Sequence, residues 1–325
     1  MSKKYFILVA YILVAIFVLQ GCYSNLTNDV EVENTNNELD VKPEIETSFS
    51  DEKETEIEIN SGDEEEKNDV QDMDIGADSG DNIKVQTSTE AYSALSNKTN
   101  AWGFVRKPEG IQPEFYGPYT KVLDDYEGIY AGNNEEKVIY LTFDEGYENG
   151  YTTTILDTLK EKDVVATFFV TMPYVKQNPD LIKRMIDEGH IVGNHTVNHP
   201  SMPEVTDDTK LVNEIMELHN YMLDNYNYEM TYLRPPKGEY SERTVKISLD
   251  LGYKTVLWSS AYDDWDTSKQ DRLDYARKMI YNNLHNGCVM LLHAVSKDND
   301  AVLGEAIDEI RSRGYEFKSL DEFER

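Results

Sequence analysis

The sequence predicts an α/β protein built as a distorted (β/α) barrel of about seven parallel strands, preceded by a disordered acidic tether. From about residue 100 onward, short apolar runs alternate with amphipathic helical stretches. Strict β-then-α alternation implies right-handed crossovers and a parallel sheet. Seven such units over about 190 residues favour an incomplete or distorted barrel over an open sheet. The chain before residue 100 lacks the apolar periodicity of folded elements.

The elements follow from the apolar pattern in chain order. Strands are predicted where short apolar runs are rich in β-branched and aromatic residues. They cover residues 138–143, 166–170, 191–193, 232–233, 255–258, 288–292 and 315–317. Helices are predicted where apolar residues recur at helical spacing between these runs. They cover residues 153–161, 179–188, 206–226, 241–251, 271–284 and 299–312.

The first 22 residues are typical of an export signal. Lys3 and Lys4 form a positive end, and residues 5–19 are almost entirely apolar, a run too short for a comfortable membrane span. The run ends in Leu-Gln-Gly-Cys at 19–22, which resembles the lipobox of bacterial lipoproteins and makes Cys22 the predicted lipidation site. The alternatives are an ordinary cleaved signal peptide and an uncleaved anchor. Each of these places the rest of the chain outside the cytoplasm, with the membrane as a partner if Cys22 carries lipid.

Residues 23–98 are predicted to form a disordered linker, and residues 99–325 a single folded domain. Residues 23–100 hold 22 acidic and 5 basic side chains and almost no aromatic ones. Runs such as residues 63–66 repel one another and bury too little apolar area to offset the entropy of ordering. The linker is interpreted as a long tether for an enzyme working in a cell wall, or as a spacer without a tuned length.

Composition excludes several classes of function. The chain has 31 basic and 62 acidic residues, a formal net charge of −31, which argues against nucleic-acid binding because that surface needs clustered Lys and Arg. Its two cysteines, Cys22 and Cys288, exclude a disulfide framework and a cysteine-based zinc cluster. No protein partner can be inferred from the sequence.

Polar residues follow the ends of five predicted strands, where a parallel barrel builds its active site. His195 and His199 are four residues apart between Gly193 and Pro200, which makes them a candidate chelating pair for a divalent metal. Each feature taken alone also has a structural interpretation, such as a turn, a helix cap, a salt bridge or a buried histidine. The five segments are Thr142-Phe143-Asp144-Glu145-Gly146, residues 193–200, Leu233-Arg234-Pro235-Pro236-Lys237-Gly238, Ala261-Tyr262-Asp263-Asp264-Trp265 and Met290-Leu291-Leu292-His293.

In order and spacing, these segments resemble the five motifs of the polysaccharide deacetylase family, also called the NodB-homology domain or carbohydrate esterase family 4. The resemblance covers about residues 136–323 and implies a NodB-like catalytic domain. Three further stretches, at residues 102–104, 126–132 and 145–152, look like the delta-lactam-biosynthetic de-N-acetylases of spore-forming bacteria. That branch implies removal of the acetyl group from muramic acid in spore-cortex peptidoglycan, on residues whose peptide has been cut off. The freed amine then closes a lactam.

The resemblance also implies a role for each residue of the site. Asp144 would be the general base and Arg234 would hold it ionised, while His293 would be the general acid, oriented by Asp264. One divalent metal ion of the Zn, Co or Mn class would lower the pKa of a water molecule and polarise the acetyl oxygen. Its ligands would be His195, His199 and Glu145. The acetyl pocket would be walled by Trp265 and Leu291, with backbone N–H groups after Pro236 completing the oxyanion site.

Two departures from the family pattern leave points open. Glu145 stands where the family usually has Asp, which leaves the metal requirement uncertain, and Ala261 stands where many members have another Asp. The alternatives are a deacetylase of other sugars, such as N-acetylglucosamine, chitin or acetylated xylan, and an inactive sugar-binding wall lipoprotein. A zinc peptidase is disfavoured, because no Glu directly follows His195.

Overall fold

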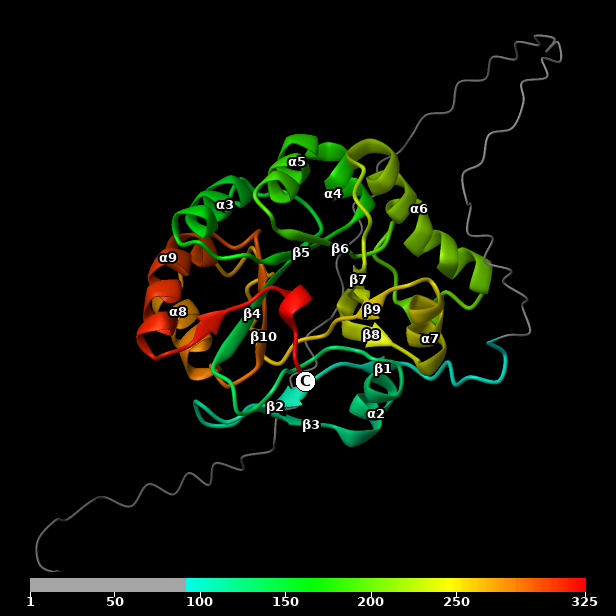
Figure 1. Ribbon diagram of the computed structural model, residues 1–325, viewed down its shortest axis with the longest axis horizontal. Helices are drawn as coiled ribbons and strands as arrows, with labels where there is room; N and C mark the ends of the chain where they lie inside the picture. The colour runs from blue at the N-terminus through cyan, green and yellow to red at the C-terminus, as the bar shows by residue number, and fades with distance from the viewer. Residues whose placement is uncertain (1–91) are drawn as a thin grey trace, which may run out of the picture. The chain divides into compact units, whose positions relative to one another are not determined.

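The computed structural model describes residues 92–325 (Figure 1). The predicted signal peptide, the predicted lipidation site Cys22 and most of the predicted linker lie outside the described residues. Within the described part, no helix combines the length and the apolar character needed to cross a membrane.

A curled sheet of seven parallel strands forms the centre of the domain, as predicted. The strand order is β10-β4-β5-β6-β7-β9, and β11 also pairs with β4. Helices pack around the outside of this sheet (Figure 1). The strands are β4 (Val138–Glu145), β5 (Thr167–Val170), β6 (Ile191–Asn194), β7 (Tyr232–Leu233), β9 (Lys254–Thr255), β10 (Cys288–His293) and β11 (Glu316–Phe317).

The predicted strand at 255–258 is shorter in the structure, because the chain changes hydrogen-bonding partner along it. Leu257 donates its N–H to the carbonyl of Ile129 at 2.7 Å. Two residues later Ser259 donates to Val289 at 2.9 Å, and Leu291 donates to Ser260 at 2.8 Å. The segment after β9 therefore bridges to β10 and joins the two edges of the curled sheet.

Side chains of the strands alternate between two apolar layers, and both faces of the sheet are covered. In β4, Leu141 and Phe143 belong to the outer layer between sheet and helices. Tyr140 belongs to the inner layer that fills the barrel, and Asp144, four residues on, lies on the same face. Because of this alternation, every second side chain near the end of a strand points toward the centre of the barrel.

All six predicted helices form, and two more were not predicted. Ser241 and Ser296 begin helices α7 and α9 as side-chain caps, each accepting from a backbone N–H three residues on. The predicted helices are α3 (Thr152–Glu161), α5 (Pro179–Asp187), α6 (Asp208–Tyr226), α7 (Glu242–Asp250), α8 (Leu273–Asn282) and α9 (Lys297–Ser312), and the others are α2 (Gly117–Asp125) and α4 (Met172–Gln177). Residues 92–325 also form three short 3₁₀ turns, at Met202–Glu204, Pro236–Gly238 and Leu320–Glu322.

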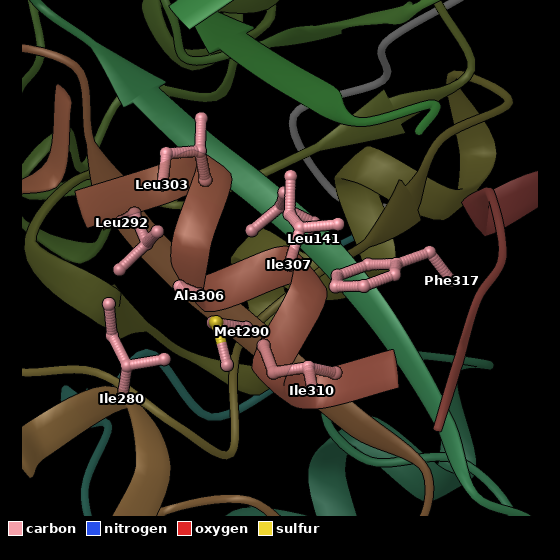
Figure 2. Close-up of a pocket in the computed structure, with 9 residues that line it drawn as sticks. All are labelled: Leu141, Ile280, Met290, Leu292, Leu303, Ala306, Ile307, Ile310 and Phe317. Atoms are coloured by element: carbon pink, nitrogen blue, oxygen red, sulfur yellow. The ribbon is translucent and has the colours of Figure 1, made fainter. Parts of the chain in front are cut away.

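The outer layer contains one small cavity where α8 and α9 pack on β4 and β10 (Figure 2). Its volume is about 10 Å³, near the lower limit for one water molecule. Its lining is entirely apolar, with Leu141, Met290 and Ile307 among the residues drawn in Figure 2. A water there would find no hydrogen-bond partner in a side chain, so the cavity is a packing gap and not a binding site.

The chain from Tyr92 to residue 116 packs against the rest of the domain, and its first residues precede the boundary predicted at residue 98. Tyr92 is buried, and its hydroxyl donates to Asp250 at 3.0 Å. The amide of Asn97 donates to Pro203 at 2.9 Å. The short strand β1 (Asn100–Ala101) then pairs with β8 (Glu239–Tyr240), and β2 (Phe104–Val105) pairs with β3 (Glu114–Phe115). Within the described residues, these contacts therefore begin at Tyr92.

Candidate active site

Four of the predicted catalytic and ligand residues lie at the carboxyl ends of strands of the same parallel sheet. Asp144 in β4 and His293 in β10 are direct partners in the strand register. His195 follows β6 and Arg234 follows β7, and the N–H of Arg234 donates to the carbonyl of Asn194 at 3.0 Å. The structure thus brings together side chains that lie up to 149 positions apart in the sequence.

Asp144 is held by the buried guanidinium of Arg234. Nη1 of Arg234 donates to Oδ1 of Asp144 at 2.7 Å, and Nη2 donates to Oγ1 of Thr142 at 2.9 Å. The guanidinium also lies 4.2 Å from the ring centroid of Phe169 and 5.6 Å from that of Trp258. Burial by itself would raise the pKa of Asp144, but Arg234 and the nearby histidines lower it below its ordinary value. Asp144 is therefore ionised and able to accept a proton.

His293 is bound twice by the carboxylate of Asp264. Nδ1 of His293 lies 2.8 Å from Oδ1 of Asp264, and the backbone N–H of His293 donates to Oδ2 at 2.8 Å. Burial by itself would lower the pKa of His293, but Asp264 raises it above its ordinary value. Because Nδ1 donates to Asp264, the other ring nitrogen, Nε2, remains free to carry a proton toward a substrate.

Asp264 is itself held by a side chain of α9 that was not predicted from the sequence. Nδ2 of Asn299, near the start of α9, donates to Oδ2 of Asp264, and it also donates to the carbonyl of His293 at 3.2 Å. The hydroxyl of Tyr262 in turn donates to Oδ1 of Asn299. No sequence motif joins Asn299 to Asp264, because their contact depends on how α9 packs across the loop after β9.

His195 and His199 lie side by side, with ring centroids 4.8 Å apart. Nδ1 of His195 lies 2.8 Å from the carbonyl oxygen of Arg234, so Nδ1 is the donor. Nε2 is then an acceptor and lies 3.7 Å from Oδ2 of Asp144. Burial lowers the pKa of both histidines, that of His199 to about 3. Both imidazoles are therefore neutral, the form in which histidine binds a metal.

Glu145, the predicted third ligand, does not join the two histidines. It is fully buried, and neither carboxylate oxygen has a hydrogen-bond partner among the described residues. No ion pair within 4.0 Å joins it to His195 or His199. Burial raises its pKa well above the ordinary value, and the charges of Glu148 and Asp144 add to that effect. Glu145 follows Asp144 directly on a strand, and successive side chains point to opposite faces, so the two acids lie on different sides of β4.

The side chains gathered here therefore provide only part of the ligands that a metal ion needs. The two neutral imidazoles are suitable ligands for a divalent ion of the zinc type. Between residues 92 and 325, however, no three acidic, histidine or cysteine side chains are grouped as a metal site. His195 and His199 are the side chains that would hold an ion here, and the remaining ligands would have to come from water or substrate.

The predicted pocket residues are close in the sequence to residues of this centre. Leu291 is buried in the inner layer two residues before His293, so both side chains face the barrel interior. Pro236 is buried in the loop that follows Arg234, and Trp265 is partly buried directly after Asp264. Leu291 therefore lies on the same face of β10 as His293, while Trp265 and Pro236 lie in the loops after Asp264 and Arg234.

Backbone strain is concentrated in two loops of the site. Seven non-glycine residues of the described chain have positive φ, and three of them are Thr196 at 69°, His199 at 57° and Lys237 at 60°. Such residues cost roughly 1–3 kcal/mol each and persist only where the surrounding structure enforces them. The enforced shape of these loops sets where His199 and Lys237 point.

Comparison with known proteins identifies relatives with the same domain. The model of the family "Polysaccharide deacetylase" matches residues 131–256. The peptidoglycan-N-acetylmuramic acid deacetylase PdaA of Bacillus subtilis is 43% identical over 234 residues, which cover 70% of this chain and 87% of that protein. Its solved structure, a family 4 carbohydrate esterase, matches with a TM-score of 0.68 at 41% identity and covers 70% of this chain and 98% of that one.

A family 4 carbohydrate esterase of Bacillus anthracis matches with a TM-score of 0.60 at 43% identity, over 71% of this chain and 98% of that one. The identity to both relatives extends across nearly their whole length. The family match begins at residue 131. The 234 residues aligned with PdaA are more than the chain holds from residue 131 to its end, so that alignment also includes part of the chain before residue 131. With the barrel fold and the polar strand ends described above, these matches show that the chain belongs to the polysaccharide deacetylase family of hydrolases, carbohydrate esterase family 4.

Proposed function

We propose that this protein removes the acetyl group from N-acetylmuramic acid in peptidoglycan by hydrolysing the amide bond. The observation that carries the proposal is the pair of oppositely tuned groups at neighbouring strand ends, an ionised Asp144 and a His293 with a raised pKa. Amide hydrolysis needs a base for the attacking water and an acid for the departing nitrogen. The similarity to the muramic acid deacetylase of Bacillus subtilis supports the choice of sugar.

Asp144 acts as the base in this proposal. It takes a proton from the water that attacks the acetyl carbon, and Arg234 keeps its carboxylate ionised and correctly oriented. His293 acts as the acid and gives its Nε2 proton to the amide nitrogen as the carbon–nitrogen bond breaks. Asp264 orients the imidazole through Nδ1 and stabilises its positive form. The products are acetate and the free amine of the sugar.

A divalent metal held by His195 and His199 would lower the pKa of a water molecule and polarise the acetyl oxygen. The acetyl methyl group is expected to lie against Leu291 and Trp265. Backbone N–H groups after Pro236 are expected to face the oxyanion, where preorganised donors are most effective. Glu145 lies on the opposite side of β4 from Asp144 and takes no part in the transfer of protons.

The location follows from the N-terminal residues and the nature of the substrate. Peptidoglycan lies outside the cytoplasm, which agrees with an export signal at residues 1–22. We infer that the protein is anchored through a lipidated Cys22, with the acidic linker giving the domain reach into the wall, or that it is secreted. In spore cortex, the freed amine would close a lactam with the lactyl carboxyl of the same sugar.

The test is direct hydrolysis of defined glycans. Purified protein is incubated with peptidoglycan strands whose muramic acid carries no peptide, and the products are analysed by mass spectrometry. The expected result is loss of one acetyl group from muramic acid. Chitin oligomers and acetylated xylan serve as alternative substrates. Acetyl loss from those substrates alone would replace the proposed sugar, and loss from none of them would favour the inactive sugar-binding interpretation.

A further inference from the structure

Asn299 is a buried amide at the start of α9 to which the reaction described above gives no role. Its Nδ2 donates to Oδ2 of Asp264, and it also donates to the carbonyl oxygen of His293 at 3.2 Å. Both of these atoms are acceptors, so the nitrogen of the amide must face them and the amide oxygen Oδ1 must face away. Asn299 therefore bridges the carboxylate of Asp264 and the backbone of the histidine that this carboxylate orients.

Tyr262 fixes the amide of Asn299 in that orientation. Its hydroxyl donates to Oδ1 of Asn299, and burial raises the pKa of Tyr262, so the hydroxyl keeps the proton that it donates. The backbone of Asn299 is held as well, because its N–H donates to Oγ of Ser296 at 3.2 Å, the cap that begins α9. The amide is thus fixed at both ends, and its nitrogen cannot exchange places with its oxygen.

Three hydrogen-bond donors converge on the carboxylate of Asp264. Oδ2 accepts from the backbone N–H of His293 at 2.8 Å and from Nδ2 of Asn299, while Oδ1 lies 2.8 Å from Nδ1 of the His293 ring. Each donor brings a hydrogen, so the carboxylate is bound in its ionised form, which only accepts. Because Oδ2 is held by two donors, the carboxylate cannot rotate, and Oδ1 stays against the imidazole.

We propose that Asn299 is a positioning residue of the deacetylation, which locks the carboxylate of Asp264 in the orientation that makes His293 an effective acid. Tyr262 holds the amide for this purpose. The proposal rests on the proposed function and adds these two residues to it. It concerns the step in which the sugar nitrogen leaves. The electron pair of the breaking carbon–nitrogen bond stays on nitrogen, which takes the Nε2 proton of His293 and departs as the amine, and the imidazole becomes neutral.

The test compares two acetyl compounds that differ in their need for this proton. One is a peptidoglycan strand, whose nitrogen must be protonated to leave, and the other is p-nitrophenyl acetate, whose nitrophenolate leaves without a proton. The first variant is Asn299→Leu, which keeps a similar shape and removes the amide. The second combines it with Tyr262→Phe, which removes the hydroxyl that would otherwise lose its partner, so that folding is preserved.

Ser296→Ala is the matched control at the same helix end. It removes the hydroxyl that accepts from the backbone N–H of Asn299 but leaves the side-chain amide in place. The lost cap should lower Tm by roughly 2–4 °C. Activity on both compounds should stay within about twofold of the wild type, since the contact with Asp264 remains.

For Asn299→Leu and the double variant, kcat/KM on the glycan strand should fall by about 10-fold to 100-fold, the usual range for a hydrogen bond to a charged group, mainly through kcat. Hydrolysis of p-nitrophenyl acetate should stay within about threefold, because its leaving group needs no acid. A loosened Asp264 stabilises the imidazolium of His293 less, so the alkaline limb of kcat/KM on the strand should also move to lower pH.

The titratable and charged groups that face His293 are the same in all of these proteins, so a moved alkaline limb reports on how Asp264 is held. They are Asp264 after β9, Asp144 in β4, Arg234 after β7, and His195 and His199 after β6. If the wild type does not hydrolyse p-nitrophenyl acetate, the alkaline limb alone decides.

Three results would overturn the proposal: equal losses on both compounds, an alkaline limb that stays in place, or a loss in Ser296→Ala as large as that in Asn299→Leu. The last of these would mean that the effect comes from the helix end and not from the amide. A wild-type protein that leaves the glycan strand acetylated would instead reject the proposed function.

Discussion

Asp264 contacts His293 through both of its carboxylate oxygens, one on the ring nitrogen Nδ1 and one on the backbone N–H, each at 2.8 Å. The second contact fixes the backbone from which the imidazole projects, so Asp264 sets the position of the ring as well as its charge. Asn299 holds Oδ2 of Asp264 from the other side. The acid of the proposed reaction is thus oriented by a chain of contacts that begins in α9.

The first prediction concerns the alkaline side of the pH profile. Asp264→Asn removes the negative charge that raises the pKa of His293, so that pKa should fall. Because the proposed acid must be protonated, the alkaline limb of kcat/KM should move to lower pH, and kcat should fall roughly 10²–10⁴-fold at neutral pH. The measurement is a pH profile of acetate release for both proteins. An alkaline limb that stays in place would show that His293 is not the titrating acid.

The second prediction isolates the base. Asp144→Asn keeps the size of the side chain and still offers an oxygen to Arg234, but it cannot accept a proton. It should lower kcat by roughly 10²–10⁴-fold with little change in KM, because the lost interaction belongs to the transition state. Thermal unfolding should show that the variant is folded. Wild-type kcat in the variant would rule out Asp144 as the base.

Much of the fold was predictable because the strands are buried on both faces. Runs such as residues 138–143 are mostly apolar and are followed directly by an acidic residue, Asp144, so both the strand and its functional end are visible in the sequence. Helices α2 and α4 were missed because they are short and begin with Gly117-Pro118 and Met172-Pro173, which resemble turns. Proline at the first positions of a helix is nevertheless well tolerated.

The site was predictable where it depends on strand ends and not where it depends on packing between elements. Asp144 and His293 could be expected to meet, because both end parallel strands. Glu145 was grouped with His195 on the family pattern, although strand alternation alone separates Glu145 from Asp144. Asn299 carries no signal, because its contact with Asp264 exists only once α9 has packed against the barrel.

The third prediction tests where the folded domain begins. Tyr92 is 8% exposed and donates to Asp250, so Tyr92→Ala should cost about 2 kcal/mol of unfolding free energy, or ~4–8 °C in Tm. Tyr116→Ala is the matched control, because Tyr116 is 60% exposed and should change Tm little. Limited proteolysis should leave a fragment that begins before Tyr92. A stable fragment that begins near residue 100, with no Tm loss in Tyr92→Ala, would return the boundary to residue 98.

The last prediction separates the metal ligands from Glu145. His195→Ala removes one of two adjacent neutral imidazoles, so activity after chelator treatment should need at least tenfold more added metal for half recovery, as expected when a ligand is lost. Glu145→Gln keeps the buried volume and should leave the metal titration unchanged, because the Glu145 carboxylate has no contact with either histidine. The measurement is acetate release as a function of added metal, made on the chelator-treated wild type and both variants. A shift for Glu145→Gln as large as that for His195→Ala would make Glu145 a ligand, and full activity of the chelator-treated wild type would remove the metal from the reaction.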